Sequence, residues 1–386
     1  MINNNLANYI LLLTLPIAMI SGLFVAPWTC TFFAIILWNC RNNLEIANFS
    51  ISKLEIIILL YAFSSCIWSI APQTSIITAI QLTAIICLCR LIINRNDLIV
   101  IDNQKLLFGI LLALIVFYIE KFSDGFISRT VRIFTSNPKE YHLSWFDRGC
   151  SLLSIATWPM LYILVKDNKK FLAILLYSLV LSALLVSDNM SGLIGFLLAT
   201  IGYVLLMISK MRLSWLIKIS IILYIIIMPI ASKFEEPRLI AKEYGHMIPI
   251  SYIHRLLIWN FVSNSAMEHP IIGQGIGTSK FTAIEERDKF FYQNEMLSPL
   301  PLHPHNNVLQ IFLELGLVGV LLFGLYIWKI LSSICNISAT NKDILWGTAT
   351  NAIFINYFFI GMVSFGIWQS WWMLSILLLI ILSRPR

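Results

Sequence analysis

Two histidines and two asparagines stand in the segment PLPLHPHNNVLQIFLELG (residues 299–316), just before a long apolar run. An imidazole, with an ordinary pKa near 6.5, can take a proton from a hydroxyl group near neutral pH. If a helix begins near His305, then Asn306, Gln310 and Glu314 form one polar stripe along it. Polar residues on membrane helices usually face a bundle interior or a wet cavity. The stripe predicts a cavity open to the outside with His305 at its rim, or else a capped helix bonded to its neighbours.

Two arginines are candidates for binding an anion. Arg255 lies in a segment, residues 253–267, that is apolar nearly all round when plotted as a helix and is expected to pack against the membrane surface or the bundle. A lone guanidinium there needs an anionic partner, either an acid such as Glu268 or a phosphate, which arginine binds in a bidentate way. Arg148 ends a polar loop at the start of an apolar run, where Asp147 is an alternative local partner.

The glycines of GQGIG (residues 273–277) are not a dinucleotide fingerprint, because no strand precedes them and their spacing is wrong. They predict a tight turn that brings the backbone close to another group. We expect no metal, since His303 and His305 are two residues apart with no acid nearby in the sequence. The long loops hold no cysteine, so no disulfide framework is expected there.

The elements that must position these groups are membrane helices. Of the 386 residues, 58% are hydrophobic and 12% are charged, mean hydropathy is +0.81, and apolar runs of spanning length recur. We predict an all-α polytopic membrane protein, a single integral membrane domain (residues 1–386) with about 12 transmembrane helices. The expected spans are residues 6–25, 27–40, 51–70, 73–93, 105–120, 149–165, 171–187, 190–208, 213–231, 306–328, 343–362 and 365–382. Residues 6–40 could instead form one re-entrant pair.

The distribution of Lys and Arg predicts the orientation of these helices. Every second short connection carries basic residues, whereas the opposite ones, around Pro27, Pro72, Asp188 and Phe365, carry none. Both termini are therefore expected in the cytoplasm. Two long loops, residues 121–148 and 232–305, fall on the outer face and hold all six histidines. The net charge of +7 thus reflects topology, and we expect no nucleic-acid partner.

Three motifs resemble the O-antigen ligases of bacterial lipopolysaccharide assembly. They are LPLHPHNNVLQIFLELGLVG (residues 300–319), RLLIWNFVSNSAMEHPIIGQGIGTS (residues 255–279) and FDRG (residues 146–149), and the rest of the chain matches only in hydropathy. The resemblance implies a glycosyltransferase in the bacterial inner membrane, with its active site facing the periplasm. Such ligases move a glycan from undecaprenyl diphosphate to the lipid A-core oligosaccharide and need neither metal nor cofactor.

The resemblance also implies roles for individual residues. His305 would act on the acceptor hydroxyl and Arg255 would bind the donor diphosphate, so both are expected to be catalytic. The expected substrate-binding residues are Arg148, His303, Asn306, Gln310 and Glu314. Many members carry an arginine in the outer turn that here reads SDNMSG (residues 187–192), so one diphosphate contact is either missing or supplied by Arg148.

Two alternative functions remain open at this point. The same motifs occur in O-antigen polymerases, which use a second lipid-linked glycan as the acceptor. A glycolipid flippase or transporter is an alternative of another class. Transporters often show repeated halves and broken helices near the midplane, whereas this chain shows no repeat and concentrates its polar groups at one face.

Overall fold

The computed structural model describes residues 4–22, 24–40, 50–94, 101–133, 143–234, 237–244, 247–285, 288–293 and 295–384. The first long loop is therefore described at its two ends only. Two of the six loop histidines, His142 and His246, lie outside the described residues.

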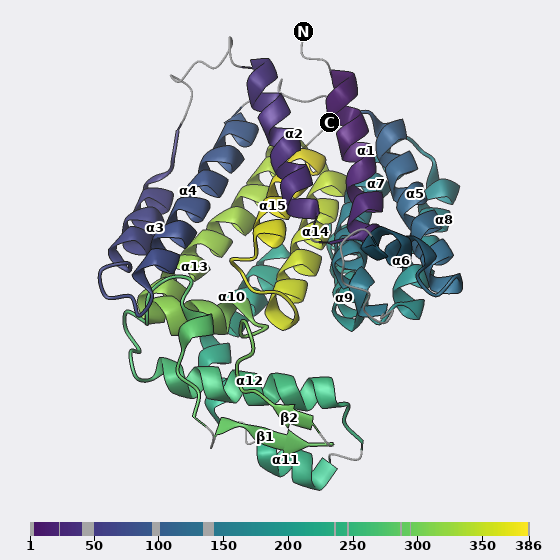
Figure 1. Cartoon of the computed structure of the whole chain (residues 1–386). Helices are drawn as coiled ribbons and strands as arrows, with labels where there is room; N and C mark the ends of the chain where they lie inside the picture. Colours follow the sequence, from purple (N-terminus) through teal and green to yellow (C-terminus); the bar gives the residue numbers. More distant parts are fainter. Residues whose placement is uncertain are drawn as a thin grey trace.

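The described chain is a helical bundle, with a small hairpin and short helices at one end (Figure 1). In chain order its elements are α1 (Asn4–Ile20), α2 (Val25–Cys40), α3 (Lys53–Ser64), α4 (Pro72–Asn94), α5 (Asn103–Phe122), α6 (Phe126–Ile133), α7 (Asp147–Lys166), α8 (Lys170–Val186), α9 (Met190–Ile208), α10 (Ser214–Phe234), α11 (Pro237–Tyr244), α12 (Ile250–Ala266), β1 (Phe290–Tyr292), β2 (Glu295–Leu297), α13 (Asn307–Thr340), α14 (Ile344–Val363) and α15 (Ser370–Leu382). The strands pair antiparallel, with Phe291 opposite Met296.

A helix lies at each of the twelve expected positions. Six of the described helices (α4, α7, α9, α10, α13 and α14) are long and apolar enough to cross a membrane. α3 ends at Ser64 and α15 begins at Ser370, so both are shorter than the expected spans 51–70 and 365–382. The expected class, a mostly helical multi-pass membrane protein, is confirmed, with two three-residue strands added.

Apolar side chains lie both inside and outside this bundle. α7 is the central helix, because every side chain from Gly149 to Leu164 is buried. Outer helices bury a narrower face and expose isoleucines and leucines, for example Ile77 (57% exposed) on α4 and Leu60 (64% exposed) on α3. A bilayer solvates such side chains, so an exposed apolar surface is what a membrane-spanning bundle requires.

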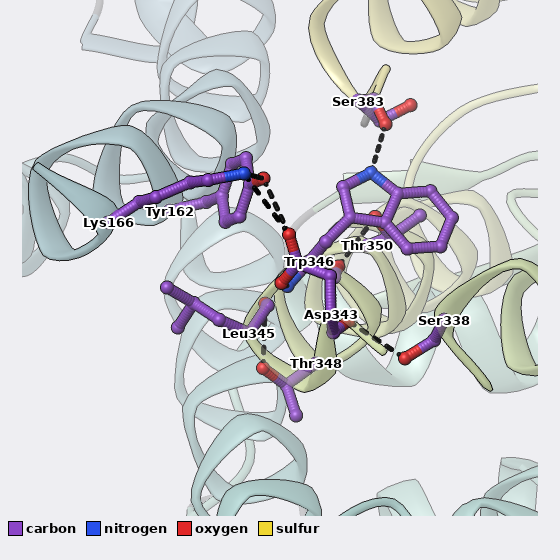
Figure 2. A network of polar contacts seen from close by, with 9 residues as sticks. All are labelled: Tyr162, Lys166, Ser338, Asp343, Leu345, Trp346, Thr348, Thr350 and Ser383. Atoms are coloured by element: carbon purple, nitrogen blue, oxygen red, sulfur yellow. Dashed lines mark hydrogen bonds and ion pairs between the residues drawn. The ribbon is translucent and has the colours of Figure 1, made fainter. Parts of the chain in front are cut away.

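A polar network around Asp343 holds the end of the bundle where α14 begins (Figure 2). The Asp343 carboxylate accepts hydrogen bonds from the Tyr162 hydroxyl (3.0 Å) and from the Trp346 N–H (2.8 Å), and it pairs with the Lys166 ammonium (3.3 Å). The Trp346 indole N–H donates to the carbonyl of Ser383 (2.7 Å). α7, α14 and α15 are thus fastened together where α14 starts.

The opposite end carries α11, α12 and the β1–β2 hairpin (Figure 1). α12 packs on α10 and α13, as expected for the segment 253–267. A separate small cluster of buried residues joins it to α11 and the hairpin: Ala241, Ile253, Leu257, Tyr292 and Leu297. α1 begins and α15 ends at the other end of the molecule, so the large loop lies away from both.

Helix α13 differs from the expected continuous span 306–328. It begins at Asn307, because the Asn306 side chain accepts hydrogen bonds from the N–H groups of Val308 (3.0 Å) and Leu309 (3.1 Å) and caps the helix. It is also broken at Gly316, where φ is 61° and ψ is −162°. The break frees backbone groups inside the bundle, and these need partners.

Residues 270–277, here called the glycine turn, supply those partners. Four backbone hydrogen bonds join the turn to the break: Leu317 N–H to Pro270 C=O (2.8 Å), Val318 N–H to Ile271 C=O (3.2 Å), Gln274 N–H to Leu313 C=O (3.0 Å) and Gly275 N–H to Glu314 C=O (2.8 Å). The close approach predicted from the sequence is confirmed. Gly273 has a φ of +69°, and a Cβ on it would meet the backbone of Glu314.

We predict that Gly316→Ala destabilises the protein whereas Gly324→Ala, on the same helix, does not. Alanine at residue 316 must adopt a left-handed φ, and its Cβ would meet the backbone of Ile271. A Cβ at residue 324 has only Ile225 nearby, at 3.9 Å. Thermal unfolding in detergent should show a lower Tm for Gly316→Ala alone. Equal Tm values for the two variants would contradict the constraint placed on the break.

Candidate functional site

The C-terminal end of α14 brings three predicted site residues together. The last carbonyls of a helix lack intrahelical partners and carry partial negative charge, so they attract N–H donors and cations. Here the Val363 carbonyl accepts from Nε of Arg255 (3.0 Å). The Ser364 carbonyl accepts from Nδ1 of His305 (2.6 Å) and, over a longer distance, from Nε2 of His303 (3.4 Å). α12 and the loop before α13 therefore meet at one point.

His305 has one ring nitrogen held and one free. Since a carbonyl can only accept, Nδ1 must carry the hydrogen, and Nε2 is left with its lone pair. Within the described part of the chain Nε2 has no hydrogen-bond partner. The backbone of His305 has a φ of +53°, a conformation that residues with a side chain adopt rarely and that often marks a functional position. Nε2 of His305 is thus positioned to accept a proton.

His303 differs from His305 in that both of its ring nitrogens are engaged. Nε2–H donates to Ser364, and Nδ1 accepts a long hydrogen bond from the Gln369 amide (3.5 Å). The two imidazole rings lie 4.3 Å apart. His303 therefore braces the ring of His305 and offers no free acceptor nitrogen of its own.

Burial sets the charge state of both histidines. Burial and, to a smaller extent, the neighbouring His303 lower the pKa of His305 to about 4, although the hydrogen bond to Ser364 acts in the opposite direction. Burial is also the main cause that lowers the pKa of His303. Both rings are consequently neutral at pH 7, as proton acceptance by His305 requires.

Arg255 is half-buried and is held by carbonyls alone. Besides Val363 it donates from Nη1 to the carbonyl of Ser251 (3.2 Å). It forms no ion pair with any described residue, so the sequence alternative of a salt bridge to Glu268 is wrong. Burial lowers the pKa of Arg255, but guanidinium remains charged at any physiological pH. A half-buried cation with unused donors is a site that an anionic ligand would complete.

Arg148 is the second residue of α7 and lies on the same side of the molecule. Its guanidinium lies 5.6 Å from the centroid of the Trp371 ring, a cation–π arrangement. The expected local partner, Asp147, forms no ion pair with Arg148 in the described part of the chain, but the charges of the two side chains act on each other. The positive charge of Arg148 acts on His303, as that of Arg255 acts on His305. The second arginine thus belongs to the same polar region.

The outer turn 187–192, where the resemblance led us to look for an arginine, also reaches this region. The Asn189 amide donates to the carbonyl of Asp147 (2.7 Å) and to the hydroxyl of Ser151 (2.8 Å). The Ser191 hydroxyl donates to that of Ser364 (3.2 Å). The turn therefore lies beside both α7 and the end of α14.

The polar stripe of α13 lies in the protein interior. Asn306, Gln310 and Glu314 are at most 3% exposed, so the wet cavity predicted along the stripe is wrong, and the alternative of a capped helix bonded to its neighbours holds. The Asn306 amide donates to the Tyr224 hydroxyl (2.9 Å), and Gln310 accepts from the N–H of Ile367 (3.0 Å). The sequence spacing correctly predicted that the three residues share one face of a helix. It could not predict which groups that face contacts.

The Glu314 carboxylate is the most enclosed group of the stripe. It accepts hydrogen bonds from the backbone N–H groups of Gly277 (2.6 Å) and Ser279 (3.2 Å), from the Gln310 amide (3.0 Å) and from the Trp368 indole. These contacts join the glycine turn to the connection between α14 and α15. Glu314 thus stabilises the packing of α13 against the glycine turn and against the connection between α14 and α15.

Some groups of the site were missed by the sequence analysis. The carbonyls of Val363 and Ser364 leave no signal in a sequence, because every residue has one. Gln369 could have been noticed as a lone amide in an apolar C-terminal region. No group of three or more His, Cys, Asp or Glu residues in the described ranges could hold a metal ion.

Comparisons with known proteins identify the family to which the chain is similar. Residues 173–324 match a protein-family model described as "O-Antigen ligase", a range that contains Arg255, His303, His305 and Glu314. The chain is 37% identical over 350 residues to a Rickettsia felis protein named "Putative polysaccharide ligase", covering 89% of this chain and 82% of the relative. It is 34% identical over 406 residues to a Rickettsia bellii protein of the same name, covering 98% and 97%. A Rickettsia typhi relative is 36% identical over 334 residues, covering 86% and 80%.

We predict that His305 titrates well below the ordinary histidine value of about 6.5. As the pH falls from 7, His305 should remain neutral with its hydrogen on Nδ1, and it should take up a proton near its pKa of about 4. Nitrogen-15 NMR of the histidine-labelled protein in nanodiscs distinguishes the two neutral tautomers from the cation. His305→Asn identifies the signal by removing it. Protonation at pH 6.5 or above, or a hydrogen on Nε2, would refute the arrangement.

Proposed function

The chain belongs to the O-antigen ligase family, and from that premise we propose that it transfers a glycan from undecaprenyl diphosphate to the lipid A-core oligosaccharide. One observation supports this proposal above all others. At the end of α14, a guanidinium with unused donors and an imidazole with a free acceptor nitrogen are held side by side. This pairing suits a reaction in which an anion departs while a hydroxyl group loses its proton.

We place the reaction at the periplasmic face of the bacterial inner membrane, with both termini in the cytoplasm. The proposal rests on the Lys and Arg distribution and on the position of the large loop, at the end of the bundle away from the start of α1. Residues 121–148 and 232–305 are then the two periplasmic loops. The polyprenyl tail of the donor would lie among the apolar helices, and its diphosphate would reach Arg255.

The bonds of the proposed reaction change as follows. The acceptor hydroxyl oxygen attacks the anomeric carbon of the donor sugar, and the bond from that carbon to the diphosphate oxygen breaks. The hydroxyl proton passes to Nε2 of His305, and undecaprenyl diphosphate leaves with the bonding electron pair. Arg255, with Arg148 as a second cation, stabilises the charge that develops on the leaving group.

The donor itself would adjust the basicity of His305. In the protein without ligand, burial keeps the pKa of this imidazole near 4, which makes it a weak base. A diphosphate bound between Arg255 and the ring adds negative charge, and negative charge raises the pKa of a neighbouring histidine. His305 would therefore become an effective base only when the donor is present.

The remaining predicted site residues receive supporting roles in this proposal. His303 orients His305, and Arg148 contacts the diphosphate in place of the arginine absent from residues 187–192. Substrate binding by Asn306, Gln310 and Glu314 stays a prediction. Their contacts favour a positioning role, since each is bonded to protein groups.

Reconstitution of the purified protein with lipid-linked glycan and lipid A-core tests the function. A ligase joins the two, and the product is detected by gel mobility and mass spectrometry. A polymerase lengthens the donor glycan instead, and a transporter moves glycolipid across the bilayer without forming a new bond. Either of these last two results would refute the proposal.

We predict that Arg255→Lys lowers kcat/KM by about 10- to 100-fold, the cost of losing charge-assisted hydrogen bonds. A lysine ammonium cannot bind both carbonyls and still present a planar fork to the diphosphate. Arg129→Lys, an exposed arginine on α6, is the matched control and should transfer at the wild-type rate. Full activity in Arg255→Lys and also in Arg255→Ala would remove Arg255 from the mechanism.

We predict that His305→Ala lowers the transfer rate by about 10²- to 10⁴-fold while donor-lipid binding is retained. His305→Asn should do the same, and because asparagine tolerates a positive φ, it separates loss of the imidazole from backbone strain. His303→Ala should keep more activity, since it leaves Nε2 of residue 305 in place. Transfer and donor binding are measured in the same folded preparations. Transfer at the wild-type rate in either residue 305 variant would exclude His305 as the base.

A further inference from the structure

A cavity of about 740 Å³ lies on the face of α12 that is turned away from Arg255. At 3.6 residues per turn, the cavity-lining residues Asn260 and Asn264 fall roughly half a turn from Arg255. The end of α10, the start of α11, residues from the segment 268–285 and Asp288 form other parts of the wall. None of the catalytic groups proposed above lines this cavity.

Two buried polar side chains line the cavity with groups left unbonded. The Gln274 side chain is 6% exposed, and its Oε1 accepts a hydrogen bond from the Thr282 hydroxyl (3.1 Å). Its amide NH₂ has no partner in the described ranges. The Ser265 hydroxyl is 9% exposed and likewise has no hydrogen-bond partner there. Neither atom is among the fully buried side-chain atoms without a partner, so both groups face the cavity, where a polar ligand, or the water it displaces, can form hydrogen bonds with them.

The charges around the cavity exclude a simple anion site. Lys233 and Arg238 contribute positive charge, but Glu268, Glu285 and Asp288 contribute negative charge. A diphosphate would meet three carboxylates there, and like charges at close range repel. A neutral ligand with many hydroxyl groups suits the mixed charges, the free amide and the free hydroxyl.

The lining also offers an apolar surface. Phe261 of α12 is half-buried at the cavity wall. Aromatic rings provide large apolar faces, and the C–H faces of sugar rings are apolar while their edges carry hydroxyl groups. A few fixed polar groups combined with an aromatic wall are typical of ligand pockets of this size.

We propose that this cavity binds a saccharide, namely sugar units remote from the bond that reacts. The inference rests on the proposed function for the source of the sugar, which is either the glycan carried by the donor or the core oligosaccharide of the acceptor. α12 separates the cavity from Arg255 by one helix thickness, about 10 Å. A chain of linked sugars can extend around one helix, whereas a single sugar held at the diphosphate cannot.

The test is calorimetric titration of the full-length protein in nanodiscs with three probes. These are the glycan released from its lipid by mild acid, the core oligosaccharide released from lipid A, and inorganic diphosphate. Gln274→Met removes the free amide at nearly constant size. Asn264→Trp, at an exposed position, fills the cavity from its edge. Gln104→Met, an exposed glutamine on α5 outside the cavity, is the matched control.

The wild type and Gln104→Met should bind at least one of the two saccharides equally well. Gln274→Met should weaken that binding by about 2- to 10-fold, the effect of one lost hydrogen bond, and Asn264→Trp should abolish it. Thermal unfolding verifies that both variants are folded. The inference is overturned if neither saccharide binds, if both cavity variants bind like the control, or if diphosphate is the probe whose binding they weaken.

Transfer assays on the same preparations separate this inference from the proposed function. If the wild type binds saccharide through the cavity but forms no product from lipid-linked glycan and lipid A-core, the saccharide site stands and the proposed reaction fails. If the wild type transfers glycan while the cavity variants bind saccharide normally, the reaction stands and the cavity inference fails.

Discussion

The break in α13 at Gly316 is the constraint on which the end of the bundle with α11, α12 and the β1–β2 hairpin depends. An apolar environment offers no water to backbone N–H and C=O groups, and each unpaired group there costs several kcal/mol. The glycine turn satisfies the freed groups through four hydrogen bonds, which is possible only because Gly273 and Gly316 let two backbones approach closely. The large loop is therefore anchored inside the bundle, and α12, which leads into the turn, is held in place by it.

The same anchoring extends to the histidines. Glu314 lies next to the break and binds the glycine turn on one side and Trp368 on the other. Trp368 belongs to the connection that follows Ser364, and the Ser364 carbonyl fixes the tautomer of His305. The need to pair the backbone groups freed at Gly316 is thus linked, through this series of contacts, to the position of the His305 imidazole.

The sequence predicted the parts of this structure that depend on local pattern. Apolar runs gave the positions of the helices, because burial in lipid or in a bundle core leaves the same hydropathy signal. The motif residues Arg255, His303 and His305 were identified by type and resemblance, and the structure brings them to one place. The break at Gly316 was not predicted, because a single glycine within an apolar run is compatible with a continuous helix. Nor could the carbonyls of α14 be predicted, because backbone acceptors are identical at every residue.

Carbonyl groups rather than carboxylates hold Arg255, and this has a consequence for turnover. A carboxylate partner in direct contact would have to be displaced by the donor, whereas the carbonyl acceptors are neutral, and the Asp147 carboxylate acts on Arg255 only through its charge, without an ion pair among the described residues. In the proposed reaction the leaving undecaprenyl diphosphate ends in a free phosphate, whose second ionisation has a pKa of about 6, so it carries more negative charge than the donor. Arg255 and the newly protonated His305 then hold the product more tightly than the substrate. If the proposed reaction takes place, we expect product release to limit the cycle, and continued transfer would depend on a separate process that withdraws undecaprenyl diphosphate from the membrane face.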